Sequence, residues 1–421
     1  MTTTRLDVAA ASAHTLATVR ALGEEQVSLA HAHGRVLARD VVSSVSLPPW
    51  DNASMDGYAV RADDVRGASV SHPVHLQVVA TIAAGTRAER GLATGEAMRI
   101  MTGAPVPPGA DTVIRVEDTD GGTAHVAISD DRDLTRNIRL RGEDVTANHR
   151  VIARGVPLSA AHIGVLSSVG CGTPWVHRAP RVAILATGDE IVPVEEFDRV
   201  IAGDRIVSSN SYSLAAAVHA AGGEPVQLGI APDDPDRLAE CLRGAAGCDL
   251  VVTSGGVSVG DFDYTRRVVA QLGGTLTMWR VKMRPGAPLG FGSLFGVPWL
   301  GLPGNPVSAL VTFELFGRPL VRALSGNLRP HRRTISVVVG EPIVLSAPLT
   351  HFLRVVLDDE ASAALPIARL TGGQGSGMLT SMSAADALLI VPPEPQTVAA
   401  GVVLRAIPLD GDVGGSARFL A

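Results

Sequence analysis

The chain has little of several features that define common protein classes. Of its 421 residues only 4% are aromatic and three are cysteine, namely Cys171, Cys241 and Cys248. The odd cysteine count and the lack of a C-x-x-C pair fit no disulfide framework, so we expect small apolar core residues at these positions. No apolar run reaches the roughly 18 residues that span a membrane, and the N-terminus has no signal-peptide pattern. These absences predict a soluble cytoplasmic protein with no membrane partner.

Signatures of several functional classes are also missing. None of the 12 histidines forms an H-E-x-x-H or similar metal-binding spacing. There is no G-x-S-x-G elbow and no Walker A loop, no internal repeat and no low-complexity segment. The net charge of -6 argues against a general nucleic-acid binder. With 46% hydrophobic and 19% charged residues, the chain is long enough for roughly two to four globular domains.

Apolar patterning divides the chain into parts with different secondary structure. The first forty residues are expected to be helical, and short apolar runs between Gly and Pro predict a β-rich module from about residue 74 to 150. Residues 181–325 alternate between short apolar runs and helical patterns, which predicts a mostly parallel sheet with helices on both faces. Strands of 275–281 and 299–302 and a long helix over 307–324 are expected at its end. From about residue 330 onward the chain is again β-rich.

The most informative turn follows a predicted buried strand at 250–253. Residues 254–264 read Ser-Gly-Gly-Val-Ser-Val-Gly-Asp-Phe-Asp-Tyr. Small residues between a strand and a helix let backbone N–H groups approach a phosphate. Asp261 and Asp263 lie at the same turn, which suggests a nucleotide-like ligand with a divalent metal between phosphate and carboxylate. Taken alone, the Gly255–Gly256 pair is equally typical of a tight turn without a ligand.

Similar turns recur where the other predicted strands of the central part end. These turns lie at 187–190, 232–234, 282–286 and 302–308. Ligands of open α/β sheets bind at the carboxyl ends of the strands, so five such turns favour a ligand site over turn formation alone. Lys282 and Arg284 can pair with anionic oxygens. Carboxylates that can hold Mg²⁺, or hydrogen-bond a ribose and a base, are Glu190, Asp233 and Asp263.

Further polar clusters lie outside the central part, at 51–58, 100–107 and 137–144. Taken singly, each is more typical of a capping or turn cluster than of a site. The glycine-rich residues 371–377 fit either a flexible surface loop or a loop that contacts an anion. The residues alone leave these alternatives open.

Together these motifs resemble those of the molybdopterin molybdenumtransferase family, which includes the E domain of gephyrin. Each stretch is modest by itself, but the ordered set, which covers about residues 7 to 410, is highly specific. The matching stretches are 52–59 (Asn-Ala-Ser-Met-Asp-Gly-Tyr-Ala), 100–107 (Ile-Met-Thr-Gly-Ala-Pro-Val-Pro), 141–144 (Arg-Gly-Glu-Asp), 187–190 (Thr-Gly-Asp-Glu), 254–264 and 301–308 (Gly-Leu-Pro-Gly-Asn-Pro-Val-Ser).

The resemblance implies a fold and an assembly. The fold class is multidomain α/β plus β, in an elongated homodimer whose active site lies between the subunits. The implied parts are an N-terminal and linker domain at 1–178 with a β-rich lid module inserted at about 55–140, a central doubly wound, mostly parallel α/β molybdopterin-binding domain at 179–327, and a C-terminal β-barrel domain at 328–421.

The resemblance also implies a reaction and its residues. The enzyme would insert molybdate into adenylylated molybdopterin and release AMP in a Mg²⁺-dependent step, and it could contact the adenylyltransferase that makes this pterin nucleotide. The implied catalytic residues are Asp56, Thr102, Asp144, Glu190, Asp233 and Asp263, of which Glu190, Asp233 and Asp263 would hold Mg²⁺. The implied substrate-binding residues are Ser254, Gly255, Gly256, Lys282, Arg284, Pro303, Gly304, Asn305 and Ser308. The implied molybdate ligands are Arg284, Ser308, Arg354 and Ser376.

One segment departs from the family pattern. The family often has Lys-Pro-Gly-Lys-Pro where residues 284–288 read Arg-Pro-Gly-Ala-Pro, and it often has Lys where Arg280 stands. Arg keeps the charge but binds as a fork, whereas Ala287 removes a cation. Strand alternation would place Lys282 on the same face as Arg280 and Arg284, so Lys282 can substitute.

Two other functions compete with molybdenum insertion. A non-enzymatic scaffold of the gephyrin type is disfavoured because the acidic positions of the family are retained. A molybdopterin adenylyltransferase, which uses ATP, is disfavoured because such enzymes need only the α/β domain. Loss of activity on replacing Asp56, Asp144 and Asp263 by Ala would exclude the scaffold, and ATP-dependent release of pyrophosphate would favour the adenylyltransferase.

Overall fold

The structure is a computed structural model that describes residues 5–256, 262–358 and 364–409, with the side chains of 262–264 left out. The described residues fall into two compact units. Unit 1 contains the chain up to residue 39, residues 155–159, and the chain from residue 173 onward. Unit 2 contains residues 40–154 and 160–172.

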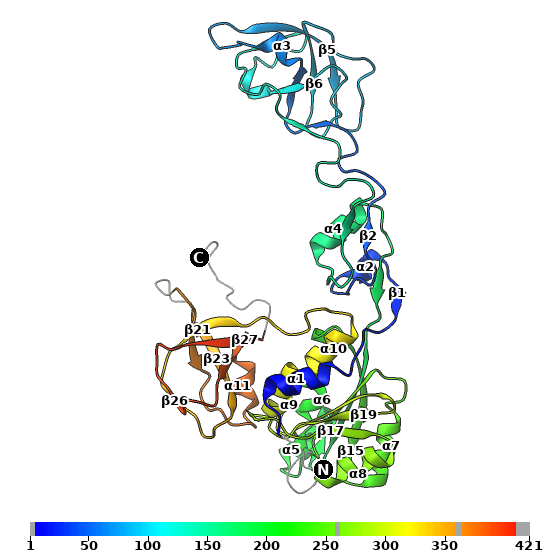
Figure 1. Ribbon diagram of the computed structural model, residues 1–421, viewed down its shortest axis with the longest axis vertical. Coiled ribbons are helices and arrows are strands. Elements are labelled where there is room, and N and C mark those ends of the chain that lie inside the picture. The colour runs from blue at the N-terminus through cyan, green and yellow to red at the C-terminus, as the bar shows by residue number, and fades with distance from the viewer. Residues whose placement is uncertain (1–4, 257–261, 359–363, 410–421) are drawn as a thin grey trace. The chain divides into compact units, whose positions relative to one another are not determined.

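A six-stranded sheet forms the centre of unit 1 (Figure 1), in the order β15-β12-β16-β20-β19-β17. The parallel strands are β15 (Glu224–Ala231), β12 (Arg181–Thr187), β16 (Leu250–Ser254) and β20 (Val297–Leu302). Two antiparallel strands, β19 (Gly290–Leu294) and β17 (Thr275–Met278), complete one edge. All of β16 is buried, because a central parallel strand is covered on both faces. The predicted mostly parallel α/β sheet is confirmed, although β19 was not predicted.

Helices cover both faces of this sheet (Figure 1). Side chains alternate along each strand, so Val182 and Ile184 of β12 enter one core cluster and Ala183 and Leu185 enter the other. The first cluster packs against α1 (Val8–Leu16), α6 (Ser209–Ala220), α9 (Pro306–Thr312), the π-helical η3 (Phe313–Gly317) and α10 (Arg318–Leu324). The second packs against α7 (Pro235–Arg243) and α8 (Phe262–Gln271). The expected long helix is thus two α-helices joined through a π-helical turn.

The helical prediction for the first forty residues holds only for α1 and for the short α2. Helix α1 begins at an Asp7 cap, whose carboxylate accepts from Ala10 N at 2.7 Å. A short strand, β1 (Glu24–Gln26), follows and pairs with β11 (Trp175–His177), and the next helix, α2, spans only Leu29–Ala32. A pairing across some 150 residues overrides local helical preference here.

A closed barrel forms the C-terminal part of unit 1, as expected. Its five strands follow the order β23-β24-β21-β27-β25, and β25 pairs back with β23. Their bounds are β21 (Ile335–Val339), β23 (Thr350–Asp358), β24 (Ile367–Leu370), β25 (Ala387–Val391) and β27 (Val403–Pro408). The short β18 (Met283–Arg284) leaves the α/β part and pairs with β23. The inward residues form a continuous aliphatic core.

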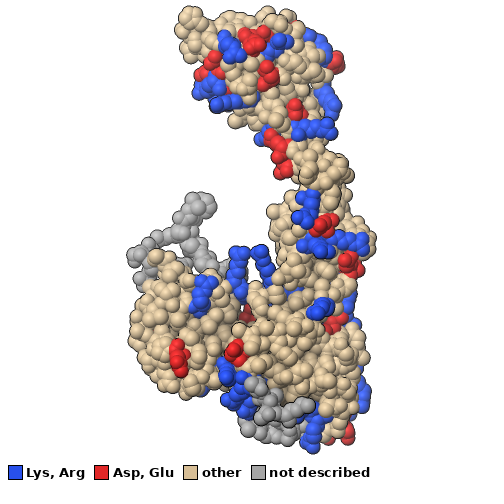
Figure 2. All heavy atoms as spheres, viewed as in Figure 1, with Lys and Arg blue, Asp and Glu red and all other residues tan. Residues whose placement is uncertain are grey.

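A mixed five-stranded sheet forms the centre of unit 2, in the order β7-β4-β6-β5-β8. Its strands are β4 (Gly57–Val60), β5 (Val74–Ile82), β6 (Glu96–Ile100), β7 (Thr112–Arg115) and β8 (His125–Ile128). The helices of unit 2 are α3 (Ala62–Val65), the short 3-10 helix η1 (Val116–Asp118) and α4 (Ala160–Ser168). Acidic and basic side chains intermingle over unit 2 on the face shown in Figure 2.

Two further expectations concern the cysteines and the membrane. All three cysteines are free thiols, and Cys248 is part of the α/β core while Cys241 packs against it. Burial raises the pKa of the Cys171 and Cys248 thiols, which keeps them protonated at neutral pH. Within the described ranges, no helix is long and apolar enough to cross a membrane.

Candidate active site

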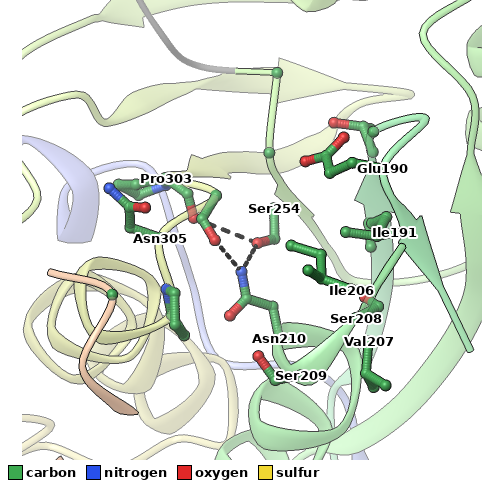
Figure 3. Close-up of a pocket in the computed structure, with 18 of the residues that line it drawn as sticks. Glu190, Ile191, Ile206, Val207, Ser208, Ser209, Asn210, Ser254, Pro303 and Asn305 are labelled. Carbon is green, nitrogen blue, oxygen red and sulfur yellow. Dashed lines mark hydrogen bonds between the residues drawn. The ribbon is translucent and has the colours of Figure 1, made fainter. Parts of the chain in front are cut away.

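A cavity of about 690 Å³ opens at the carboxyl ends of β12, β16 and β20 (Figure 3). Three kinds of residue line it. Its polar residues include Thr187, Gly188, Ser208, Ser209, Asn210, Ser254, Gly255, Gly256, Gly304 and Asn305, its apolar wall includes Ile191, Ile206, Val207, Pro288 and Pro303, and its carboxylates are Glu190 and Asp233. Four of the five predicted strand-end turns therefore contribute to one cavity.

The Gly255–Gly256 turn brings backbone close to the cavity. Both glycines have positive φ, +99° and +63°. A Cβ at Gly255 would collide with the Thr187 backbone, and a Cβ at Gly256 would lie 2.6 Å from Thr265 Oγ1. Only glycine fits this turn without strain, and without side chains the backbone N–H groups of such a turn are accessible to an anionic ligand.

Asn210 also lines the cavity, although no motif in the sequence predicted it. It lies in the first turn of α6, and its Nδ2 donates to Ser254 Oγ at 2.7 Å and to the Gly304 carbonyl at 2.8 Å (Figure 3). A polar run, Ser208 to Ser211, at the start of an otherwise Ala-rich helix was the available signal. This run lies far in sequence from both loops that it contacts.

Ser376 of the glycine-rich loop lies next to the same cavity. Its hydroxyl accepts from Asn305 Nδ2 at 3.1 Å, and its carbonyl accepts from Val307 N at 3.1 Å. The neighbouring Gly377 and Leu379 line the cavity. The loop at 371–377 is therefore anchored to the α/β part.

Arg354 supports this loop from inside the barrel. Its side chain is fully buried, and its guanidinium donates to the carbonyls of Gly373, Gln374 and Gly375 and to Ser381 Oγ at 3.0–3.2 Å. Burial lowers the Arg354 pKa. In this arrangement Arg354 holds the loop, and its role as a molybdate ligand stays a prediction.

The predicted cationic ligands do not line the main cavity. Lys282 and Arg284 are exposed, and Arg284 borders a separate cavity of about 330 Å³ together with His351, Arg354 and Gln374. The reason is β18, which draws this segment toward the barrel. Strand β18 does not include Lys282. The exposure of residues 281–284 nevertheless alternates as predicted, because Val281 and Met283 are buried while Lys282 and Arg284 are exposed.

Two other predicted residues are placed only in part. Ser308 is 4% exposed in α9, where its carbonyl accepts from Thr312 Oγ1, and it does not appear among the described lining residues. The Asp263 side chain lies outside the described part of the structure, as does Asp261.

Two of the three predicted residues of unit 2, Asp56 and Thr102, are hydrogen-bonded to each other. Asp56 Oδ1 accepts from Thr102 N at 2.7 Å and from Thr102 Oγ1 at 2.8 Å. These two hydrogen bonds hold the pKa of Asp56 below its usual value, so the carboxylate stays ionised over the whole neutral range. Asp144 is exposed in a turn, where its backbone N–H donates to the Leu47 carbonyl.

The carboxylates of the main cavity fit a hard divalent cation. Glu190 and Asp233 both line it, and Mg²⁺ is typically held by one or two carboxylates together with substrate phosphates. Among the residues that the structure describes, no group of three or more His, Cys, Asp or Glu side chains forms a self-sufficient metal site. The donor set therefore suits an ion that is held jointly with a phosphate ligand.

Three family models match the chain in succession. The MoeA N-terminal region (domain I and II) matches residues 6–170, the probable molybdopterin binding domain matches residues 183–323, and the MoeA C-terminal region (domain IV) matches residues 336–409. Together the three matches cover most of the chain.

Curated relatives and solved structures agree with these matches. The chain is 38% identical over 393 residues to molybdopterin molybdenumtransferase 2 of Mycobacterium tuberculosis, covering 92% of this chain and 95% of the relative. It is 42% identical over 306 residues to molybdopterin molybdenumtransferase of a Nostoc species, covering 72% and 70%. A crystal structure of a molybdopterin biosynthesis MoeA protein from Pyrococcus horikoshii has a TM-score of 0.83 at 27% identity, covering 96% of this chain and all of the other.

Proposed function

Because the chain belongs to the MoeA family of molybdopterin molybdenumtransferases, we propose that it inserts molybdate into adenylylated molybdopterin and releases AMP. Family membership makes it a transferase of molybdenum cofactor biosynthesis. The observation that carries the specific reaction is the cavity at the strand ends. One edge consists of glycine turns, one wall is aliphatic, and two carboxylates also line the cavity.

This division of the cavity suits a pterin nucleotide. Phosphate oxygens would lie at the Gly255–Gly256 and Gly304–Asn305 turns, where backbone N–H groups are close. A planar ring would pack against Ile191, Ile206 and Val207, because flat heterocycles bury their faces on apolar side chains. The substrate is then oriented before any bond is broken.

Glu190 and Asp233 would hold Mg²⁺, with Asp263 as a third ligand. When bound, Mg²⁺ neutralises charge on the phosphoanhydride oxygens. The carboxylates then act as ligands and as acceptors that orient an attacking water or oxyanion. We assign them no nucleophilic role.

Molybdate, the second substrate, would bind where the barrel loop contacts the α/β part. Ser376 and Ser308 would offer hydrogen-bond donors, Arg284 a cation, and Arg354 would act directly or through the loop that it supports. Lys282 would supply charge that Ala287 lacks. Arg binds oxyanions as a planar fork, so the pair Arg280 and Arg284 retains oxyanion binding without the usual lysines.

We further propose that the protein is a homodimer in which unit 2 of one subunit completes the cavity of the other. Asp56, Thr102 and Asp144 would then act on the partner subunit's substrate. The two hydrogen bonds from Thr102 support this role, because they fix the orientation of the Asp56 carboxylate.

The proposed compartment is the cytoplasm. Three free thiols suit a reducing environment. An adenylyltransferase must supply the pterin nucleotide, and we propose that it contacts this protein so that the labile substrate passes directly.

AMP release tests the proposal. The purified protein would be mixed with adenylylated molybdopterin, Mg²⁺ and molybdate, and AMP would be quantified by chromatography. Molybdate-dependent AMP release is expected, and Glu190→Gln should lower its rate at least about tenfold because a metal ligand is lost. Binding without release would favour a scaffold, and pyrophosphate release from ATP would favour an adenylyltransferase.

A further inference from the structure

We propose that Asn210 is a positioning residue that clamps the two ligand-binding loops of the cavity together. The inference rests on the proposed function, because it assigns the loops at 254–256 and 303–305 to the phosphate part of the substrate. Asn210 itself is not a catalytic residue. It acts through Ser254 and Gly304.

The first argument is the geometry of the Asn210 carboxamide. Both of its N–H bonds are used, one to Ser254 Oγ at 2.7 Å and one to the Gly304 carbonyl at 2.8 Å. A carbonyl can only accept, so the contact with Gly304 fixes which end of the amide faces the loops. One side chain therefore joins the last residue of β16 to the loop after β20.

The second argument is that, beyond the pairing of β16 with β20 up to Ser254 and Leu302, the other described hydrogen bonds between these two segments are longer than those of Asn210. Ser254 Oγ reaches the Pro303 carbonyl only at 3.4 Å, and Gly255 N reaches the Leu302 carbonyl at 3.2 Å. Both Asn210 contacts are shorter. Asn210 is 8% exposed and Ser254 is 3% exposed, so bulk water cannot replace the lost bonds cheaply.

The third argument is that the clamp connects onward to the barrel loop. The residue after Gly304 is Asn305, whose Nδ2 donates to Ser376 Oγ. Asn210 thus fixes the loop from which the α/β part reaches the glycine-rich segment. Preorganised donors strengthen binding because their ordering cost is met on folding, before the ligand arrives.

Calorimetric titration with AMP tests this role. Asn210→Leu keeps the approximate shape of the side chain but removes both donors, and we expect it to weaken the Kd for AMP by about tenfold or more. Asn210→Ser is a second variant in case the leucine variant does not fold. Titration stoichiometry reports the folded fraction, so a purely structural defect would lower stoichiometry and Tm without changing Kd.

Asn327→Leu is the matched control. Asn327 is also 8% exposed, its Oδ1 accepts from Arg329 N at 2.9 Å, and it is not among the described residues that line the cavity. It should lower Tm but leave the Kd for AMP within about twofold. An Asn210 variant that behaves in the same way would overturn the clamp.

A double variant separates the clamp from a generic polar effect. Ser254→Ala removes one acceptor, so its effect on Kd should not add to that of Asn210→Leu if both act through one network. Full additivity would contradict the clamp.

If the wild-type protein does not bind AMP at all, the proposed function fails, and the clamp fails with it. Wild-type binding that is unchanged in both Asn210 variants overturns the clamp alone.

Discussion

At the residue scale, the candidate site depends on individual residues whose hydrogen bonds or backbone conformation suit few other residue types. Asp56 is paired with both donors of Thr102. Gly255 adopts a backbone that other residues avoid, beside the Thr187 backbone. Each of these features can be changed by a single substitution.

Thr102→Ala should raise the pKa of Asp56 toward its usual value, because one of two hydrogen bonds to the carboxylate is lost while the backbone one stays. The pKa of Asp56 is lower in the folded protein than its usual value. The stability that its ionised carboxylate contributes is therefore present above the unfolded pKa and is lost as the pH falls through the folded pKa. The acid limb of AMP release should therefore move to higher pH in the variant. Carboxyl ¹³C titration by NMR measures the shift directly, and an unchanged pKa would contradict the pairing.

Gly255→Ala should abolish measurable AMP binding, because the added Cβ meets the Thr187 backbone and forces the turn open. Gly222→Ala is the control. Its φ is +92° and nothing lies within 4 Å of the added Cβ, so it should cost only about 1–2 kcal/mol of stability and leave binding intact. Thermal unfolding and AMP titration of both variants distinguish steric collision from backbone strain. Equal binding in the two variants would exclude a close approach at Gly255.

At the scale of elements, loops are placed by contacts that come from other parts of the chain. The glycine-rich loop has few side chains of its own and is held by Arg354 of β23 and by Asn305 before α9. β18 draws the Arg284 segment to the barrel. Both contacts join the α/β part to the barrel within unit 1.

Arg354→Met should lower the free energy of unfolding by about 3 kcal/mol, because the replacement keeps the apolar stem but removes a buried guanidinium that donates to four acceptors, of which Ser381 is buried and Gln374 half-buried. Amide exchange of residues 372–377 should accelerate. Arg405→Met is the control, since exposed Arg405 also donates to Thr334 and Ser336 but should cost less than about 1 kcal/mol. Denaturant unfolding of both variants makes the comparison, and a similar cost for the two would refute the supporting role of Arg354.

At the scale of the whole molecule, polar sites occur in both units. The main cavity is in unit 1, and the Asp56–Thr102 pair is in unit 2. The proposed homodimer would use the two sites together, one from each subunit.

Mixing two impaired variants tests that proposal. Asp56→Asn and Glu190→Gln homodimers should each release AMP at least about tenfold more slowly than the wild-type protein. After unfolding and refolding as an equimolar mixture, about half of the dimers are mixed and each has one intact site, so about a quarter of wild-type AMP release should return. No recovery, with mixed dimers verified by mass spectrometry, would show that both residues serve the same subunit's site.

The sequence by itself determined the family, the order of the motifs and the alternation of strands and helices in the central part. Those features are local: apolar periodicity, glycine turns and caps such as Asp7 are set by residues near one another in the chain. The position of the cavity at the strand ends followed from the same pattern.

The tertiary structure alone decided the remaining features. Strand β1 exists because Glu24–Gln26 pairs with β11, Arg354 is buried because a distant loop folds over it, and Asn210 bridges two loops that begin some 40 and 90 residues further along the chain. Arg284 faces a second cavity because β18 joins the barrel. Each depends on contacts between residues distant in sequence, which no local pattern records.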